Sequence, residues 1–166
     1  MPKMTGTLAL LKLDDKGLFA ALDEKLHNIL VEGTVEWVRT VAAIIPNWSG
    51  QSRASLKPIA DLVNVPIFVT TVSGAPNRQA EGQALGFARL IKQRGVYGFE
   101  WRSNVFYLAY NEANNANLVG FHLKNPGPYE SQKQAEQSFF RTIKPKLKSL
   151  DFGVGRHIRV VRVKNG

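Results

Sequence analysis

The sequence predicts an α+β fold, in which a long N-terminal helix and a shorter C-terminal helix pack on an antiparallel β-sheet of about four strands. Apolar residues recur every three or four positions across residues 18–44, and again across residues 135–147, which is helical spacing. The other apolar runs are β-branched or aromatic and are bounded by Gly, Pro, Asn and Ser, which is typical of strands. We expect one domain over residues 1–166.

The composition excludes several classes of protein. Hydrophobic residues make up 44% and charged residues 21%, so bulk disorder is not expected. No run of about 18 apolar residues is present, so we expect no membrane-spanning segment and no membrane partner. The N-terminus lacks a basic start followed by an apolar block, so we expect no secretion signal. Cysteine is absent, which excludes disulfides and thiolate chemistry and fits assembly in a cytosol.

The N-terminal part predicts an arm followed by the long helix. Residues 1–13 form an arm or a short strand, since residues 7–13 are apolar without a helical period. Asp14 and Asp15 are N-cap candidates for a helix about 45 Å long, which would extend beyond the core or onto a neighbouring subunit. Gly33 in its middle marks a close contact or a bend. Pro46 ends the helix, because the residue before a proline is disfavoured in helical geometry.

The next segments predict one helical turn, a strand and a loop. Residues 52–63 can form a single helical turn, which Pro58 limits. Residues 65–72 are β-branched and alternate, so we expect a strand. Residues 77–95 combine several glycines with weak helical spacing, and we favour a loop excursion over a helix. This loop carries the candidate subunit-interface residues Arg78, Arg89, Lys92 and Arg94.

Two aromatic-rich runs, residues 96–101 and 105–110, flank a short polar break and predict a β-hairpin. An asparagine-rich turn follows at residues 111–117, and then a brief strand at residues 118–123.

The last helix begins at a sequence that resembles a capping box, Ser131 with Gln134. Pro145 is expected to end or kink its last turn. Residues 151–166 are expected to form a basic C-terminal strand, because apolar and arginine residues alternate there.

Positive charge is concentrated at the C-terminal end of the chain. Of a formal net charge of +9, most lies from Arg141 onward, where Asp151 is the sole acidic residue. Such an end attracts phosphate or an acidic protein surface, and it is equally consistent with a solvated, solubilising face. The candidates for facing DNA or a protein partner are Arg156, Arg159, Arg162 and Lys164.

No catalytic constellation is present in the sequence. The three histidines lie in three different predicted elements, without the spacing of metal ligands. Gly153-Val154-Gly155 lacks the third glycine and the following helix of a phosphate-binding loop. We therefore predict a non-enzyme without cofactor or metal.

A small basic nucleic-acid-binding domain is the alternative prediction. Trp101, Phe106, Tyr107 and Tyr110 would stack on bases if they lined an exposed sheet. Both faces of the predicted strand 105–110 are apolar, however, which favours a sheet that is buried on both sides.

The segment after the long helix resembles a motif of the tail-completion, or neck, proteins of tailed bacteriophages. In that family a helix ends in Ala-Pro and is followed by Thr-Gly-x-Leu-Arg-x-Ser. Here Ile45-Pro46 precedes Ser49-Gly50-Gln51-Ser52-Arg53-Ala54-Ser55, in which Gly50, Arg53 and Ser55 match. Ser49 replaces the threonine, and Ser52 departs from the leucine.

Two further motifs are similar to those of the family. Residues 107–112, Tyr-Leu-Ala-Tyr-Asn-Glu, resemble a Tyr-Ala-x-x-x-Glu strand end, with Asn114-Asn115 in place of Gly-Thr. Pro126-Gly127-Pro128 resembles the family's Pro-x-Pro before the last helix. The order of elements agrees over residues 15–150.

The resemblance implies a structural virion protein that is assembled in the host cytoplasm. It would form a homo-oligomeric ring between the head connector or adaptor and the tail terminator or tail tube, with non-specific contact to the genomic DNA in its lumen. The junction residues would be Pro46, Gly50, Arg53 and Ser55. Physically, Gly50 permits a sharp turn, Arg53 can pair with a carboxylate or carbonyl, and Ser55 can bond nearby backbone. The alternative is that these residues build only a local turn.

Overall fold

The protein has an α+β architecture. The computed structural model describes residues 7–13, 19–45, 47–93, 96–105, 108, 131–150 and 158–164, with only the backbone in residues 7–13, 19–21 and 158–164. The elements are β1 (Thr7–Leu13), α1 (Phe19–Ile44), α2 (Gln51–Ala54), α3 (Lys57–Leu62), α4 (Gln79–Leu85), β2 (Gly86–Gln93), β3 (Val96–Ser103), α6 (Ser131–Ser149) and β4 (Ile158–Lys164).

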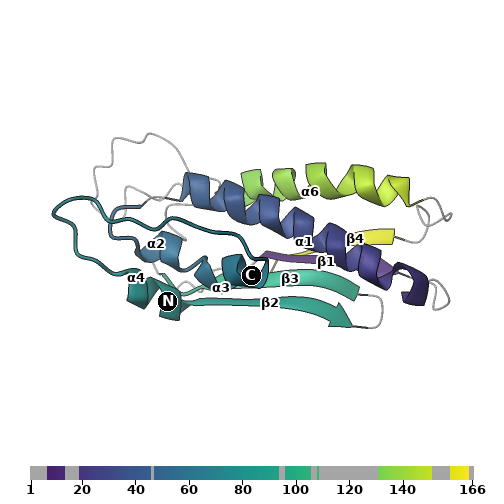
Figure 1. Cartoon of the computed structure of the whole chain (residues 1–166), viewed down its shortest axis with the longest axis horizontal. Helices are drawn as coiled ribbons and strands as arrows, with labels where there is room; N and C mark the ends of the chain where they lie inside the picture. Colours follow the sequence, from purple (N-terminus) through teal and green to yellow (C-terminus); the bar gives the residue numbers. More distant parts are fainter. Residues whose placement is uncertain are drawn as a thin grey trace.

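Figure 1 shows α1 and α6 side by side on one face of the strands, with α2, α3 and α4 gathered at one end. The predicted class, a long N-terminal helix and a shorter C-terminal helix on an antiparallel sheet, is confirmed.

The strands pair in antiparallel fashion. β2 and β3 form a hairpin that runs from Gly86↔Ser103 to Gln93↔Val96. On the other side β3 pairs with β1, and β1 pairs with β4, so that the strand order is β2-β3-β1-β4. β2 therefore lies at an edge of the sheet.

Two predictions about the middle of the chain are wrong. Residues 77–95 are not a loop excursion, because they contain α4 and β2. The predicted hairpin of residues 96–101 with 105–110 is also wrong, since β3 pairs with β2 and continues through the expected turn to Ser103. Apolar and polar residues alternate only weakly along β2. Ala88 and Leu90 are half-buried on one face of the strand, and Ala88 is small, while the large apolar Phe87 is exposed on the opposite face.

One strand prediction and two proline predictions also need correction. Residues 65–72 are extended but belong to no strand among the described elements. Pro58 does not limit a helix but lies in the first turn of α3, where its missing N–H would have no partner. Pro145 does not end α6, which continues to Ser149.

Both long helices bury the faces that their spacing predicts. α1 has 26 residues, or about 39 Å at 1.5 Å per residue. It ends at Ile44, next to the predicted stop, while Pro46, Asp14 and Asp15 lie outside the described residues. α6 buries Ser131, Ala135, Phe139, Ile143 and Leu147, which follow one another at four-residue steps.

Gly33 marks the closest contact between the two helices. A Cβ built on Gly33 would lie 2.5 Å from Cγ2 of Ile143 and 2.8 Å from Cε2 of Phe139. Of the two predicted reasons for this glycine, the close contact is confirmed.

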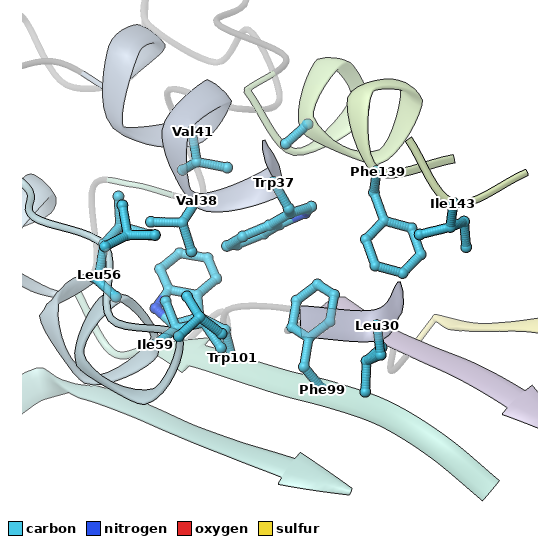
Figure 2. Close-up of a cluster of buried hydrophobic side chains, with 14 of the residues drawn as sticks. Leu30, Trp37, Val38, Val41, Leu56, Ile59, Phe99, Trp101, Phe139 and Ile143 are labelled. Carbon is cyan, nitrogen blue, oxygen red and sulfur yellow. The ribbon is translucent and has the colours of Figure 1, made fainter. Parts of the chain in front are cut away.

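The core lies between the helices and β3, around the fully buried Trp37 (Figure 2). The Trp37 ring is centred 5.3 Å from Phe99 and 5.4 Å from Trp101, and Phe99 is 5.6 Å from Phe139 on α6. Leu56, which precedes α3, and Ile59 of α3 close the same cluster. Tilted aromatic contacts of this kind add about 0.5–1.5 kcal/mol each beyond the buried area. The aromatic residues of β3 thus serve packing against the helices.

Candidate functional site

The turn after α1 depends on the backbone of Gly50. Gly50 has a φ of 76°, in the left-handed region, and directly precedes α2. A Cβ at this position would lie 2.7 Å from Cγ of Gln79 and 3.1 Å from Cγ1 of Val69. Both the conformation and the space therefore require glycine.

Arg53 joins the end of α1 to the segment of residues 65–72, which we call the extended segment. Its Nη2 donates to the carbonyl oxygen of Ile45 at 3.2 Å, and its Nη1 donates to that of Phe68 at 3.4 Å. Burial of the guanidinium lowers the pKa of Arg53 from its usual value. A cation at the C-terminal end of α1 is also favoured by the helix dipole. Of the two predicted kinds of partner for Arg53, a carboxylate or a carbonyl, the structure shows carbonyls.

Ser55 connects the same turn to the sheet. Its Oγ donates to the carbonyl oxygen of Ser52 at 2.7 Å, which confirms the predicted backbone contact. Its own carbonyl oxygen accepts a hydrogen bond from Nε1 of Trp101 at 2.9 Å. Ser52, the position that departs from the phage motif, is itself buried.

Glycines four residues apart let α4 and β2 lie directly on this turn. A Cβ on Gly82 would overlap the carbonyl group of Gln51, with the carbonyl carbon at 2.7 Å. A Cβ on Gly86 would likewise overlap that of Ser55, with the carbonyl carbon at 2.9 Å. Sequence reasoning missed this contact. The four-residue spacing of Gly82 and Gly86, equal to that of Gln51 and Ser55, is the signal that would have indicated it.

The extended segment is fixed at both ends and at two points between. Val65 N–H donates to Ala60 O at 2.9 Å, and Val72 N–H donates to Trp48 O at 2.9 Å. Besides the Arg53 contact, Nδ2 of Asn47 donates to Oγ1 of Thr70 at 2.5 Å. In Figure 1 this teal stretch runs past α2 to the left edge of the molecule and returns to α4. The junction thus holds an exposed strand-like segment in place.

The extended segment exposes apolar side chains to solvent. Phe68 is 81% exposed and Val72 is 54% exposed. Within the described part of the chain, the N–H groups of residues 67–71 donate to no backbone carbonyl. Val, Ile, Phe and Thr favour pairing in a sheet, so the segment has the chemistry of a strand without the partner.

The candidate subunit-interface cations are paired within the subunit. Arg78 precedes α4 and lies 3.9 Å from Glu81. Arg89 of β2 lies 2.5 Å from Glu100, and Lys92 lies 2.6 Å from Asp23 of α1. Arg94 lies outside the described residues. The Arg78 and Lys92 pairs are exposed, and exposed pairs contribute about 0–1 kcal/mol, so these two neutralise charge more than they stabilise.

Glu100 is a buried carboxylate that sequence reasoning missed. Its side chain is 4% exposed and contacts Arg89 and Arg102. Strand alternation directs it away from the helices, because its neighbours Phe99 and Trp101 pack against Trp37. The position of Glu100 beside Arg89 can be recognised only once the β2–β3 register is known.

Asp23 links the first part of α1 to the hairpin. It accepts hydrogen bonds from Nζ of Lys92 and from the hydroxyl of Tyr97, which together hold the pKa of Asp23 below its usual value. Burial and the contact with Asp23 raise the pKa of the Tyr97 hydroxyl far above its usual value. This cluster fixes a helix to a strand and offers no free nucleophile.

The basic C-terminal residues lie partly in β4. The register places Arg159 opposite Lys12, Arg162 opposite Ala9 and Lys164 opposite Thr7. Arg156 lies outside the described residues, and the role proposed for these four residues stays a prediction.

The described residues bear on metal binding, membrane insertion and base stacking. No group of three His, Cys, Asp or Glu residues in the described ranges is placed to hold a metal ion. Among the helices that the structure describes, none has the length and apolar character to cross a membrane. Trp101 is fully buried and bonded to Ser55, so it offers no face to a nucleic-acid base. Phe106, Tyr107 and Tyr110 lie outside the described residues.

Comparisons with known proteins assign no family to this site. No protein-family model matches the chain, and neither a curated protein nor a solved structure is significantly similar to it.

Proposed function

We propose that this chain is a structural protein of a bacteriophage neck. In this role it assembles into a homo-oligomeric ring that joins the head connector or adaptor to the tail terminator or tail tube. Genomic DNA passes through the lumen of the ring. The basic residues Arg156, Arg159, Arg162 and Lys164 face this DNA or an acidic protein rim.

One observation carries the proposal. Gly50, Arg53 and Ser55, the residues that carry the phage resemblance, build the turn that holds the extended segment. Arg53 bonds directly to the carbonyl of Phe68, whose side chain is 81% exposed. A segment that is held in place and exposes apolar side chains suits a protein in which contacts between subunits cover those side chains.

The repeating unit of this ring is the sheet of four strands in the order β2-β3-β1-β4, with α1 and α6 on one face. We further propose that the virion, and not a free enzyme pool, is where the chain acts.

Light scattering and electron microscopy of the full chain, alone and with duplex or single-stranded DNA, test this function. We expect closed rings with an open lumen, formed without DNA. A monomer that binds either DNA tightly, with an affinity that falls steeply as salt rises, would instead support the basic nucleic-acid-binding domain.

The basic end is tested by replacing Arg156, Arg159 and Arg162 together with glutamine. We expect rings to persist while DNA association weakens and becomes less sensitive to salt. A control triple variant replaces Lys25, Lys133 and Arg141, which lie on α1 and α6, with glutamine. Equal loss of DNA association in the control variant would contradict a specific role for the C-terminal arginines.

A further inference from the structure

The free edge of β2 offers unpaired backbone groups in a defined pattern. Asn104 N–H donates to Leu85 O at 3.0 Å, one position beyond the Gly86↔Ser103 pair. Hydrogen-bonded pairs alternate along an antiparallel ladder, so every second residue of β2 turns its N–H and C=O away from β3. The outward residues with free groups are Ala88, Leu90 and Lys92, because the N–H of Gly86 donates to Gln83 O. No described strand covers this edge.

The extended segment is complementary to this edge. It spans the eight residues 65–72, and β2 spans the eight residues Gly86–Gln93, so the segment has enough residues to pair along the whole of this edge. Residues 67–71 leave their N–H groups unpaired within the described chain. The segment carries no charged residue, whereas β2 carries Arg89 and Lys92.

The charge of β2 argues against pairing of β2 with a second β2. Such a pair would bring together two copies of the cluster in which Arg89 and Arg102 share Glu100, which keeps a net positive charge, and like charges across strands are destabilising. A neutral segment adds to the same edge without this cost. Within one subunit the segment does not pair with β2, and its ends are bonded instead to Ala60 and Trp48.

We propose that the extended segment of one copy adds as a strand to the β2 edge of a second copy. Strand addition satisfies the backbone groups on both sides and covers Phe68 and the neighbouring Phe87, which is 48% exposed. The two surfaces differ, so the contact repeats head to tail and closes into a ring when the rotation allows. The inference rests on the proposed ring and names the contact that builds it.

Cysteine cross-linking tests the contact directly, because the native chain has no cysteine. Single variants Val72→Cys and Phe87→Cys are mixed and oxidised, which reports antiparallel addition; Val72→Cys mixed with Gln93→Cys reports parallel addition. The control partner is Leu62→Cys in place of Val72→Cys, because Leu62 is an exposed apolar residue of α3. We expect one of the two mixtures to form mixed dimers at least about tenfold faster than the control, as a preformed contact raises the effective concentration.

Backbone pairing is tested at Thr71. The carbonyl of Phe68 is bonded to Arg53, and the N–H of a strand residue points the same way as its C=O, so residues 67, 69 and 71 turn their backbone groups outward. Thr71→Ala keeps the N–H, whereas Thr71→Pro removes it at a position where the N–H is unpaired within the described chain. We expect proline to weaken assembly about tenfold more than alanine, which corresponds to one lost hydrogen bond. Thermal unfolding of both variants checks that each one folds.

The outcomes separate this contact from the proposed function. Rings without a cross-link in either mixture would overturn the contact and leave the ring function standing. A cross-link in open filaments or simple dimers would support the contact and overturn the ring. A chain that stays monomeric at every concentration would overturn both.

Discussion

The guanidinium of Arg53 lies 3.2 Å from the carbonyl oxygen of Ile45, across the turn in which Gly50 takes a left-handed conformation. Its other nitrogen reaches the carbonyl of Phe68 at 3.4 Å. One side chain therefore holds the end of the long helix and the exposed segment together. A cation at the C-terminal end of α1 stabilises the last carbonyl groups of the helix, which have no hydrogen-bond partner within it.

Arg53→Ala should lower the free energy of unfolding by about 2 kcal/mol, because two carbonyls lose a charged donor. Urea denaturation measures the change, and hydrogen exchange of the Val72 amide should become faster as the segment loosens. Arg53→Lys should recover only part of the stability, since an ammonium is a point donor that cannot span both carbonyls. An alanine variant that matches the wild type in both measurements would rule out the anchoring role.

Gly33→Ala should destabilise the protein by about 1–3 kcal/mol through overpacking, despite the better helix propensity of alanine. The new Cβ would lie 2.5 Å from Ile143 and 2.8 Å from the ring of Phe139. Combining it with Phe139→Leu, which removes ring atoms at the contact, should cost less than the sum of the two single changes. Strict additivity in this double-mutant cycle would show that the helices do not meet at Gly33.

Gly82→Ala should be costlier than an equal enlargement elsewhere on α4. The added carbon meets the backbone carbonyl of Gln51, which cannot rotate away as a side chain can. The matched control is Ala80→Ser, which adds one atom at an exposed position of the same helix. We expect a loss of about 2 kcal/mol or more for Gly82→Ala and less than about 0.5 kcal/mol for the control. Similar melting temperatures for the two variants would contradict the close packing of α4 on α2.

Asp23 predicts a pH dependence of stability. Hydrogen bonds from Lys92 and Tyr97 lower the folded-state pKa of Asp23 below 3.8. A depressed carboxyl pKa stabilises the fold above the unfolded-state pKa, and this contribution is lost as pH falls through the folded-state value. The stability difference between the wild type and Asp23→Asn should therefore be constant near neutral pH and shrink below about pH 4. In a Lys92→Gln background, the stability difference between the protein with Asp23 and its Asp23→Asn variant should fall less as pH is lowered. A difference that stays unchanged down to about pH 2 in the wild-type background would exclude the interaction of Asp23 with Lys92 and Tyr97.

Helical periodicity made the two long helices predictable from the sequence. Phe139 and Ile143 lie four residues apart on the buried face of α6, and this spacing can be recognised in the sequence without knowing what the helix packs against. The turn chemistry of Gly50 and the local backbone contact of Ser55 were predictable as well. Both depend on residues that are neighbours in the chain.

Contacts between distant residues were not predictable. β2 was obscured by Gly86 and by its basic side chains, and it is a strand because β3 lies beside it. Residues 65–72 have the propensity of a strand but no described partner, which sequence pattern cannot reveal. The burial of Glu100 beneath Arg89 and Arg102 likewise exists only in the folded register.

The mass of the full chain in solution, measured by light scattering over a range of concentrations, tests the central claim most directly. The measurement compares the wild type with Phe68→Ser and with the control Leu62→Ser, which removes a side chain that is 45% exposed on α3. The proposal predicts a discrete oligomer for the wild type and for Leu62→Ser, and a shift of Phe68→Ser toward the 18.5 kDa monomer. A wild-type chain that remains at the mass of a monomer at every concentration would contradict it.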